Sequence, residues 1–436
     1  MSEASIEGTA AASDRPAARL DRAGTVYRAR IARRYRADKV FRACGLGAIL
    51  TALAMLALLV GSVLVVGLPA FTQSQVKLTI DFEPAVIPRD GEAVEVRRAD
   101  YMRLVRQSLA QQVSDAQGRS ALRELNRMVS RVGAENRLSS MVLKDRSIIG
   151  QQRSVWLPLW SPMDQYLKHG RTTKVSERHK RWLGELQEQE LVRGAFNWQF
   201  LTGGASREAE LAGLGAAIVG SFLTLVVTVL LAVPVAVAAA VYLEEFAPKN
   251  RLTELIEVNI NNLAAVPSIV FGLLGLAVFL NFLGLPRATP LAGGAVLALM
   301  ILPIVIIATR SALRAVPPSI REAALGVGAS RQQTVLHHVL PLATPGIMTG
   351  TIIGMAQALG ETAPLLMMGM VAFIIDVPDG FTDAATVLPV QIYQWAGFPE
   401  AGFREKTAAA IIVLLVFLIG MNAAAVLLRR RYEKRW

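Results

Sequence analysis

The chain has 436 residues, of which 53% are hydrophobic and only 6% aromatic, and its formal net charge is +12. An apolar content built from Ala, Leu, Val, Ile and Gly excludes an ordinary soluble domain and favours helices packed in lipid. The basic residues flank apolar runs instead of forming one basic face, which argues against nucleic acid as a partner.

The chain begins with a basic arm, residues 1–42, which we expect to be disordered at its start and helical near Tyr27–Val40. The first apolar run, Ala43–Phe71, starts too deep in the chain and is too long for a cleavable signal peptide. Because about 20 helical residues cross the hydrocarbon core of a bilayer, this run is predicted to be a membrane span. The single cysteine, Cys44, permits no intrachain disulfide.

Residues 72–210, here called the insertion domain, are long enough to bury a small core of their own. Alternating apolar residues predict two strands, and helical periodicity predicts three helices between and after them. The strands are expected at Val76–Phe82 and Ser147–Leu159, and the helices at Ala99–Gln112, Ser120–Val132 and His179–Arg193. The sequence of this domain does not reveal its function.

Five more apolar runs qualify as spans, and with the first they predict an all-α integral membrane protein of six transmembrane helices plus a small mixed extracytoplasmic domain. They are Leu211–Leu243, Leu263–Leu283, Pro290–Thr309, Leu342–Ile375 and Ala408–Leu428. An even number of spans places both ends on one side. Since the arm and the tail, residues 429–436, are both basic, we expect cytoplasmic termini in the cell inner (plasma) membrane. Long segments translocate largely regardless of charge, so the insertion domain is expected outside.

Residues 319–341 form a polar segment between two of these spans. Two capping boxes, Ser319–Glu322 and Ser330–Gln333, predict two short helices. Gly328 permits the turn between them, and Pro341 is expected to end the second helix. The pattern alone fits a folded linker, a docking element for a partner protein or, less well, a DNA-binding helix-turn-helix.

The spacing within this segment resembles the EAA loop of ABC importer permeases. The resemblance is carried by Glu322-Ala323-Ala324, by Gly328 and by Leu340-Pro341. It implies that the segment docks in a groove of a cytoplasmic ATPase and that residues 211–428 form the permease core. The seventeenth position of the loop, usually apolar, is His338 here, and the adjacent Val339 is the expected substitute contact.

Two further stretches resemble the PstA-type permease subunits of phosphate ABC importers: EVNINNLAAVPSIVFGLLG at Glu257–Gly275 and LGETAPLL at Leu359–Leu366. A weaker likeness, VLPVQIYQW, lies at Val387–Trp395. The resemblance implies three partners besides the lipid bilayer: a homologous PstC-type permease, a cytoplasmic ATP-binding subunit dimer and a periplasmic phosphate-binding protein.

Glu361 lies inside an apolar run, where an unpaired charge costs several kcal/mol, so such residues face a bundle interior or a water path. Small residues recur at four-residue spacing in the same run and form a ridge suited to close helix packing. If the run is one helix, Glu361 lies on the same side as this ridge. The ridge consists of Gly346, Gly350, Gly354 and Ala358. Glu361 is therefore predicted to be a gate in the substrate path or a structural tie.

Other polar residues near the runs are further candidates for the substrate path, because amides and hydroxyls can escort an anion. They serve as well to hydrogen-bond neighbouring helices. These candidates are Thr362, Asn261, Asn262, Ser268 and Arg310. Arg310 and Arg314 are predicted either to pair with Glu361 or, in better agreement with the distribution of basic residues, to anchor the cytoplasmic end of their span.

No GxxxxGK[ST] phosphate-binding loop is present, so we expect no nucleotide hydrolysis by this chain and no enzyme activity. The four histidines have no metal-ligand spacing, and no cofactor is expected. Two alternatives to a phosphate permease stay open. One is a permease of the same class for molybdate or an amino acid, and the other is a membrane-anchored sensor that uses the insertion domain as its input.

Overall fold

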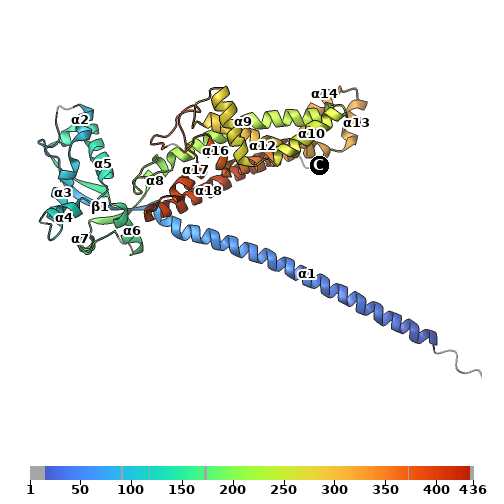
Figure 1. Cartoon of the computed structure of the whole chain (residues 1–436), viewed down its shortest axis with the longest axis horizontal. Coiled ribbons are helices and arrows are strands. Elements are labelled where there is room, and N and C mark those ends of the chain that lie inside the picture. Colours follow the sequence, from blue (N-terminus) through green and yellow to red (C-terminus); the bar gives the residue numbers. More distant parts are fainter. Residues whose placement is uncertain (1–14, 90–91, 117, 171–173, 372, 433–436) are drawn as a thin grey trace, which may run out of the picture. The chain divides into compact units, whose positions relative to one another are not determined.

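The computed structural model describes residues 15–89, 92–116, 118–170, 174–371 and 373–432 (Figure 1). It divides into two units at residue 62, and each is described by itself. The expected disordered start of the arm and the last residues of the basic tail lie outside the described residues. Within the described ranges, five helices are long and apolar enough to cross a membrane, and a bent helix pair makes a sixth candidate span. The predicted fold class is confirmed.

The first helix, α1 (Arg15–Gly67), is 53 residues long and continues into a 3-10 segment, η1 (Leu68–Phe71). It begins well before the predicted span because the arm is rich in Ala and Arg, which favour helix. The helix expected near Tyr27–Val40 is thus confirmed as part of a longer one. Its candidate membrane segment runs from Arg30 to Phe71.

The insertion domain is a three-stranded antiparallel sheet of order β2-β1-β3 covered by helices on one face. Its elements are β1 (Thr72–Asp81), α2 (Ala93–Arg98), α3 (Tyr101–Gln112), α4 (Arg119–Leu125), α5 (Arg131–Lys144), η2 (Arg146–Ile148), β2 (Gln152–Pro158), α6 (Ser161–His169), α7 (Glu177–Glu188), β3 (Val192–Phe196) and α8 (Trp198–Thr202). From Val76 to Ile80, every second residue of β1 is fully buried (Val76, Leu78 and Ile80), as period-two alternation requires. Both predicted strands are confirmed.

Two helix predictions in this domain are wrong. The helix expected over Ser120–Val132 is two helices, because Ser130 caps a new one by accepting a hydrogen bond from the Gly133 N–H. The helix expected over His179–Arg193 ends at Glu188, and its last residues belong to β3 instead. The strand β3 was not predicted, since it is short and contains Gly194.

A buried polar cluster joins the insertion domain to the last long helix. The Lys168 ammonium lies 2.7 Å from Asp164 and 3.1 Å from Glu405. The Gln165 amide also donates to Glu405, and Lys406 donates to the carbonyl of Ala212. Because these charges are almost fully removed from solvent, separating the two parts would leave them unpaired at a cost of several kcal/mol. The domain is therefore fixed to the membrane part.

The membrane part contains three closely packed helices, α9, α12 and α15, and the elements around them. In chain order these are α9 (Gly215–Val241), η3 (Tyr242–Phe246), α10 (Arg251–Ala264), α11 (Ser268–Gly275), η4 (Leu276–Phe282), α12 (Pro290–Arg314), α13 (Pro318–Gly326), α14 (Arg331–Thr334), η5 (Val335–Val339), α15 (Leu340–Gly360), α16 (Ala363–Met367), α17 (Leu388–Ala396) and α18 (Ala401–Tyr432). Between α9 and α12, the Thr228 hydroxyl donates to the Gly294 carbonyl over 3.2 Å.

Two span predictions need correction. The run Leu263–Leu283 is not one straight span, because the helix breaks before Pro267 and α10 and the following helix are bent by 102°. The run Leu342–Ile375 is not a span throughout, since its helix starts already at Arg331 and stops at Gly360.

The predicted ridge of small residues lies against α12. A Cβ on Gly350 would come within 2.2 Å of the Ala308 Cβ, and one on Gly346 within 2.6 Å of the Ala312 Cβ. Helix α15 can approach α12 this closely only because these positions carry no side chain.

We predict that Gly350→Ala destabilises the protein by about 1–3 kcal/mol, because the added methyl group forces α12 and α15 apart. Gly420→Ala on α18 is the matched control, since a Cβ there meets nothing within 4 Å. The measurement is the thermal unfolding midpoint in detergent. An unchanged midpoint for Gly350→Ala would contradict the close packing.

Candidate functional site

Helix α13 is the centre of the segment singled out in the sequence, and the structure corrects how it starts. Pro317 occupies the N-cap, and no side chain caps this helix end. Ser319 therefore lies inside the first turn and forms no capping box with Glu322, because the Pro317-Pro318 pair already starts the helix one residue earlier. The second box, Ser330–Gln333, is confirmed: the Ser330 hydroxyl accepts from the Gln333 N–H at 3.2 Å.

The exposed face of α13 carries part of the EAA-like motif. Glu322 and Ala323 are exposed, whereas Ala324 is buried against the neighbouring helices. Gly328 has a φ of +89°, the left-handed conformation that a turn after α13 requires. Leu325 and Val327 expose 50% and 86% of their surface and widen the apolar rim of this face.

The second half of the segment is not a separate short helix. Pro341 does not end it, because Pro341 lies in the first turn of α15 and the helix runs unbroken from Arg331 to Gly360. Leu340 is half-buried at this join. A π-helical segment, η5, absorbs the extra residue between the two helical stretches.

The structure also corrects the contact expected from Val339. This side chain is fully buried with Leu313 and Val316, so it is not available at the surface. His338 is exposed instead and lines, with His337, a largely apolar groove of about 750 Å³ between α12, α13 and α15. The surface at the seventeenth position is therefore an imidazole beside an apolar groove.

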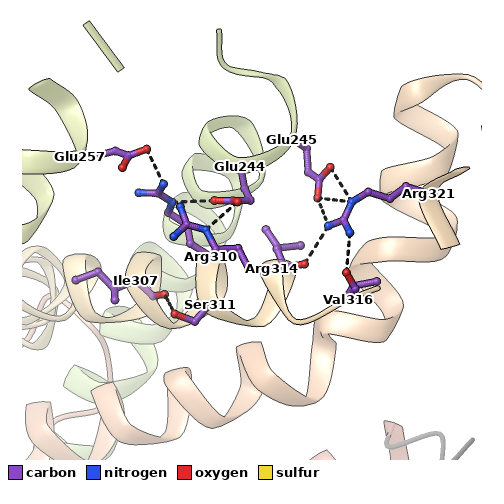
Figure 2. A network of polar contacts seen from close by, with 10 residues as sticks. Glu244, Glu245, Glu257, Ile307, Arg310, Ser311, Arg314, Val316 and Arg321 are labelled. Atoms are coloured by element: carbon purple, nitrogen blue, oxygen red, sulfur yellow. Dashed lines mark hydrogen bonds and ion pairs between the residues drawn. The ribbon is translucent and has the colours of Figure 1, made fainter. Parts of the chain in front are cut away.

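Arg321 ties α13 to two other helices, as Figure 2 shows. Its guanidinium lies 2.6 Å from Glu245 in η3, the π-helical segment that continues α9, and donates to both carboxylate oxygens. It also donates to the backbone carbonyls of Val316 and Leu313, at 2.8 and 2.9 Å, where α12 ends. One side chain thus satisfies the free carbonyls of a helix end and a buried carboxylate.

A second set of ion pairs continues this network along α12. Arg310 lies 2.6 Å from Glu257 on α10 and 3.3 Å from Glu244, which also accepts from Arg314 at 2.8 Å. These six side chains are called the arginine–glutamate network: Glu244, Glu245, Glu257, Arg310, Arg314 and Arg321 (Figure 2). Sequence reasoning missed the network, although a pair of adjacent glutamates at the end of an apolar run is a signal that partners are needed.

The arginine–glutamate network distinguishes the two predictions made for Arg310, pairing with Glu361 and anchoring the end of its span. Its guanidinium is held by Glu244 and Glu257, so the pairing with Glu361 is wrong. Arg310 links α12 to α9 and α10 at the end of the bundle that carries α13. Its place in the substrate path is not supported by this geometry.

The predicted position of Glu361 is also wrong. Glu361 follows the last residue of α15 in extended conformation, so it does not sit on the inward side of that helix. Its carboxylate is half-buried and, within the described residues, makes no hydrogen bond or ion pair. The next helix, α16, begins two residues later at Ala363, with Pro364 in its first turn.

Thr362 and Ser268 lie at the starts of two short helices that pack together, α16 and α11. A Cβ on Gly272 of α11 would come within 2.7 Å of the Pro364 backbone, so the two helices are in close contact. Asn261 and Asn262 are exposed near the end of α10, before the bend. The bend thus brings Ser268 and Thr362 onto contacting helices, whereas the two asparagines lie on the other side of the break.

This arrangement suits mechanical transmission and not bond chemistry. Within the part of the chain that the structure describes, no three His, Cys, Asp or Glu side chains come together as metal ligands. Helix α13 is exposed on the side of Glu322 and fixed to α9 and α12 on the side of Arg321. A force applied to its exposed side therefore reaches two membrane helices directly.

We predict that Arg321→Met lowers the free energy of unfolding by about 1–3 kcal/mol, because it leaves the buried Glu245 carboxylate unpaired. Adding Glu245→Gln should restore part of the loss, since the stranded charge is then absent. Unfolding midpoints in detergent measure both effects, with the exposed Arg251→Met as control. Fully additive losses in the double variant would show that the two side chains are not coupled.

Comparison with known families places these elements in context. Residues 232–434 match the family described as "Binding-protein-dependent transport system inner membrane component". Residues 28–177 match a "Domain of unknown function (DUF3333)", which covers most of α1 and much of the insertion domain. The family that matches the membrane part is a transport component and not an enzyme.

Individual relatives match the same part of the chain. A Bacillus subtilis protein named "Probable ABC transporter permease protein YqgI" is 32% identical over 52% of this chain and 73% of its own length. The phosphate transport system permease protein PstA of Mycobacterium leprae is 34% identical over 52% of this chain and 73% of its own length. Among solved structures, an inward-facing MetNI methionine ABC transporter is 18% identical over 51% of this chain and 95% of that chain, with a TM-score of 0.40. By its relatives and its matched domain, the chain belongs to the family of binding-protein-dependent transport system inner membrane components, the permeases of ABC importers.

Proposed function

We propose that this chain is the PstA-type half of the translocation pathway of an ATP-driven phosphate importer. Two relatives named PstA, from Mycobacterium leprae and Pasteurella multocida, are 34% and 30% identical over 52% and 50% of this chain. A relative named PstC, from Haemophilus influenzae, is 30% identical over a smaller share of this chain, 46%. The similarity therefore favours the PstA type over its sister subunit.

The observation that carries this proposal is the packing of α11 on α16. The two stretches that resemble PstA-type permeases, Glu257–Gly275 and Leu359–Leu366, are far apart in sequence, yet Gly272 of one touches Pro364 of the other. Residues in direct contact across two helices must suit each other in size. A chance likeness in two separate stretches would not be expected to meet in one contact.

Helix α13 is the proposed site of coupling to the ATPase. Its exposed Glu322 and Ala323 are available to a partner, and Arg321 fixes the opposite side of the helix to α9 and α12. Closure of the ATPase dimer on ATP would displace α13 as a lever and move the membrane helices between outward-facing and inward-facing states. Residues 319–341 would then act as one coupling unit.

The proposed orientation places both termini and α13 in the cytoplasm and the insertion domain, residues 72–210, outside. It follows from the basic residues at the two ends of the chain. The full assembly would comprise this chain, a PstC-type permease, two ATP-binding subunits and a periplasmic phosphate-binding protein. Residues 211–428 would contribute half of the path.

The cargo is tested by uptake of radiolabelled phosphate in a strain that lacks this chain. We expect high-affinity phosphate uptake to be lost and to return when the chain is supplied again. Unchanged phosphate uptake in the deletion strain would contradict phosphate as cargo while leaving a permease for molybdate or an amino acid in place.

Glu322→Arg is predicted to reduce uptake at least about tenfold, because an opposite charge on a docking surface costs a kcal/mol or more in partner binding. Glu254→Arg, the same change at an exposed site on α10, is the matched control and should transport normally. Uptake is measured at equal membrane levels of each variant, together with co-purification of the ATP-binding subunit. Normal uptake with Glu322→Arg would rule out coupling through α13.

A further inference from the structure

An exposed aromatic pair lies where the insertion domain meets the membrane part. Phe196 and Trp198 expose 48% and 67% of their surface, and their rings are 4.8 Å apart in an edge-to-face arrangement. Among the described tryptophans, Trp198 alone is exposed; Trp182 and Trp395, for example, are fully buried. A large aromatic pair left open to the surroundings indicates a surface that is covered in the working protein.

Asn197, the residue between Phe196 and Trp198, holds the two rings next to the end of the first candidate membrane segment. Asn197 is buried, its N–H donates to the Phe71 carbonyl over 2.8 Å, and its side-chain amide donates to the Ala70 carbonyl over 3.3 Å. Phe71 is the last residue of the first candidate membrane segment. The backbone next to Trp198 is therefore bonded directly to the end of a membrane span.

A second candidate span, which starts with α9, also has one of its ends close to the aromatic pair. Helix α8 begins with Trp198, and its Phe200 carbonyl accepts from the Leu214 N–H, directly before α9 starts at Gly215. The Phe200 ring also packs edge-to-face on Phe71 at 5.4 Å. Two spans thus bracket the aromatic pair.

These bonds place the pair next to the end of the candidate membrane segment, where a span would meet the boundary layer of a bilayer. That layer is roughly 5–8 Å thick on each side of the hydrocarbon core, and one residue of extended chain covers about 3.3 Å. Phe196 and Trp198 each lie one residue from the hydrogen bond between Asn197 and Phe71, so their backbone is within a few ångström of the end of the candidate segment. The span itself leads up to them with exposed apolar side chains, Val65 at 75% and Leu68 at 55%.

We infer that Phe196 and Trp198 insert into the headgroup layer of the bilayer and fix the base of the insertion domain on lipid. An indole ring has an apolar body and an N–H donor, and this combination favours the membrane–water boundary. The exposed apolar side chains at the end of the span, together with the two exposed rings, favour lipid over a protein partner as the occupant. The inference does not depend on the cargo of the proposed permease.

The test is tryptophan fluorescence of the full chain in nanodiscs made with brominated phospholipids. Subtracting the Trp198→Phe spectrum gives the emission of Trp198. We expect bromine placed near the headgroup end of the acyl chain to quench this emission at least about twofold more than bromine at the chain end. Aqueous iodide should quench it little.

Trp156→Phe is the matched control, since Trp156 pairs with Lys77 in the sheet, about 20 Å along the strand from Phe71 at the span end. Its emission should respond to iodide and not to brominated lipid. If Trp198 responds like Trp156, or is shielded from both quenchers by protein, the lipid contact is refuted. A normal circular dichroism spectrum of each variant establishes that it is folded.

Discussion

The arginine–glutamate network is the interaction on which the arrangement of the membrane part depends. Two opposite charges in contact attract by about 4 kcal/mol at an effective dielectric constant near 20, and removing them from water costs a comparable amount. The pairs therefore add little net stability. Their effect is geometric, because any movement that separates Arg321 from Glu245 or Arg310 from Glu257 leaves a charge unpaired. The segment η3 after α9, the helix α10, the end of α12 and the helix α13 are therefore constrained to move together.

This constraint explains why α13 can be exposed and still transmit force. A short helix on a flexible linker would move with a bound partner without displacing the membrane helices. Here Arg321 bonds both the end of α12 and the end of α9, and Val339 and Val316 pack in the apolar cluster beneath. At the opposite end of the bundle, the cluster around Lys168 and Glu405 fixes the insertion domain to α18 in the same way. Movements of the membrane helices therefore reach the insertion domain.

Sequence patterns predicted those features that depend on local chemistry. Apolar length predicted most of the spans, and the four-residue spacing of Gly346 and Gly350 predicted close helix packing, though not that the partner is α12. Local rules failed where neighbouring residues competed. Pro317 and Pro318 start α13 before Ser319 can cap it, and Pro267 breaks its helix while Pro303 stays inside α12. The ion pairs join residues 53 to 76 apart in sequence, and only the packed fold decides which arginine meets which glutamate.

The central claim is that α13 contacts a nucleotide-binding subunit, and photo-crosslinking measures this contact directly. A photoreactive amino acid is placed at Ala323, which is exposed, and in a second variant at Gly420 on α18. After irradiation of intact membranes, the account predicts an adduct between position 323 and an ATP-binding subunit, and none from position 420. An irradiated position 323 that captures no nucleotide-binding protein, while the complex is assembled and active, would contradict the account.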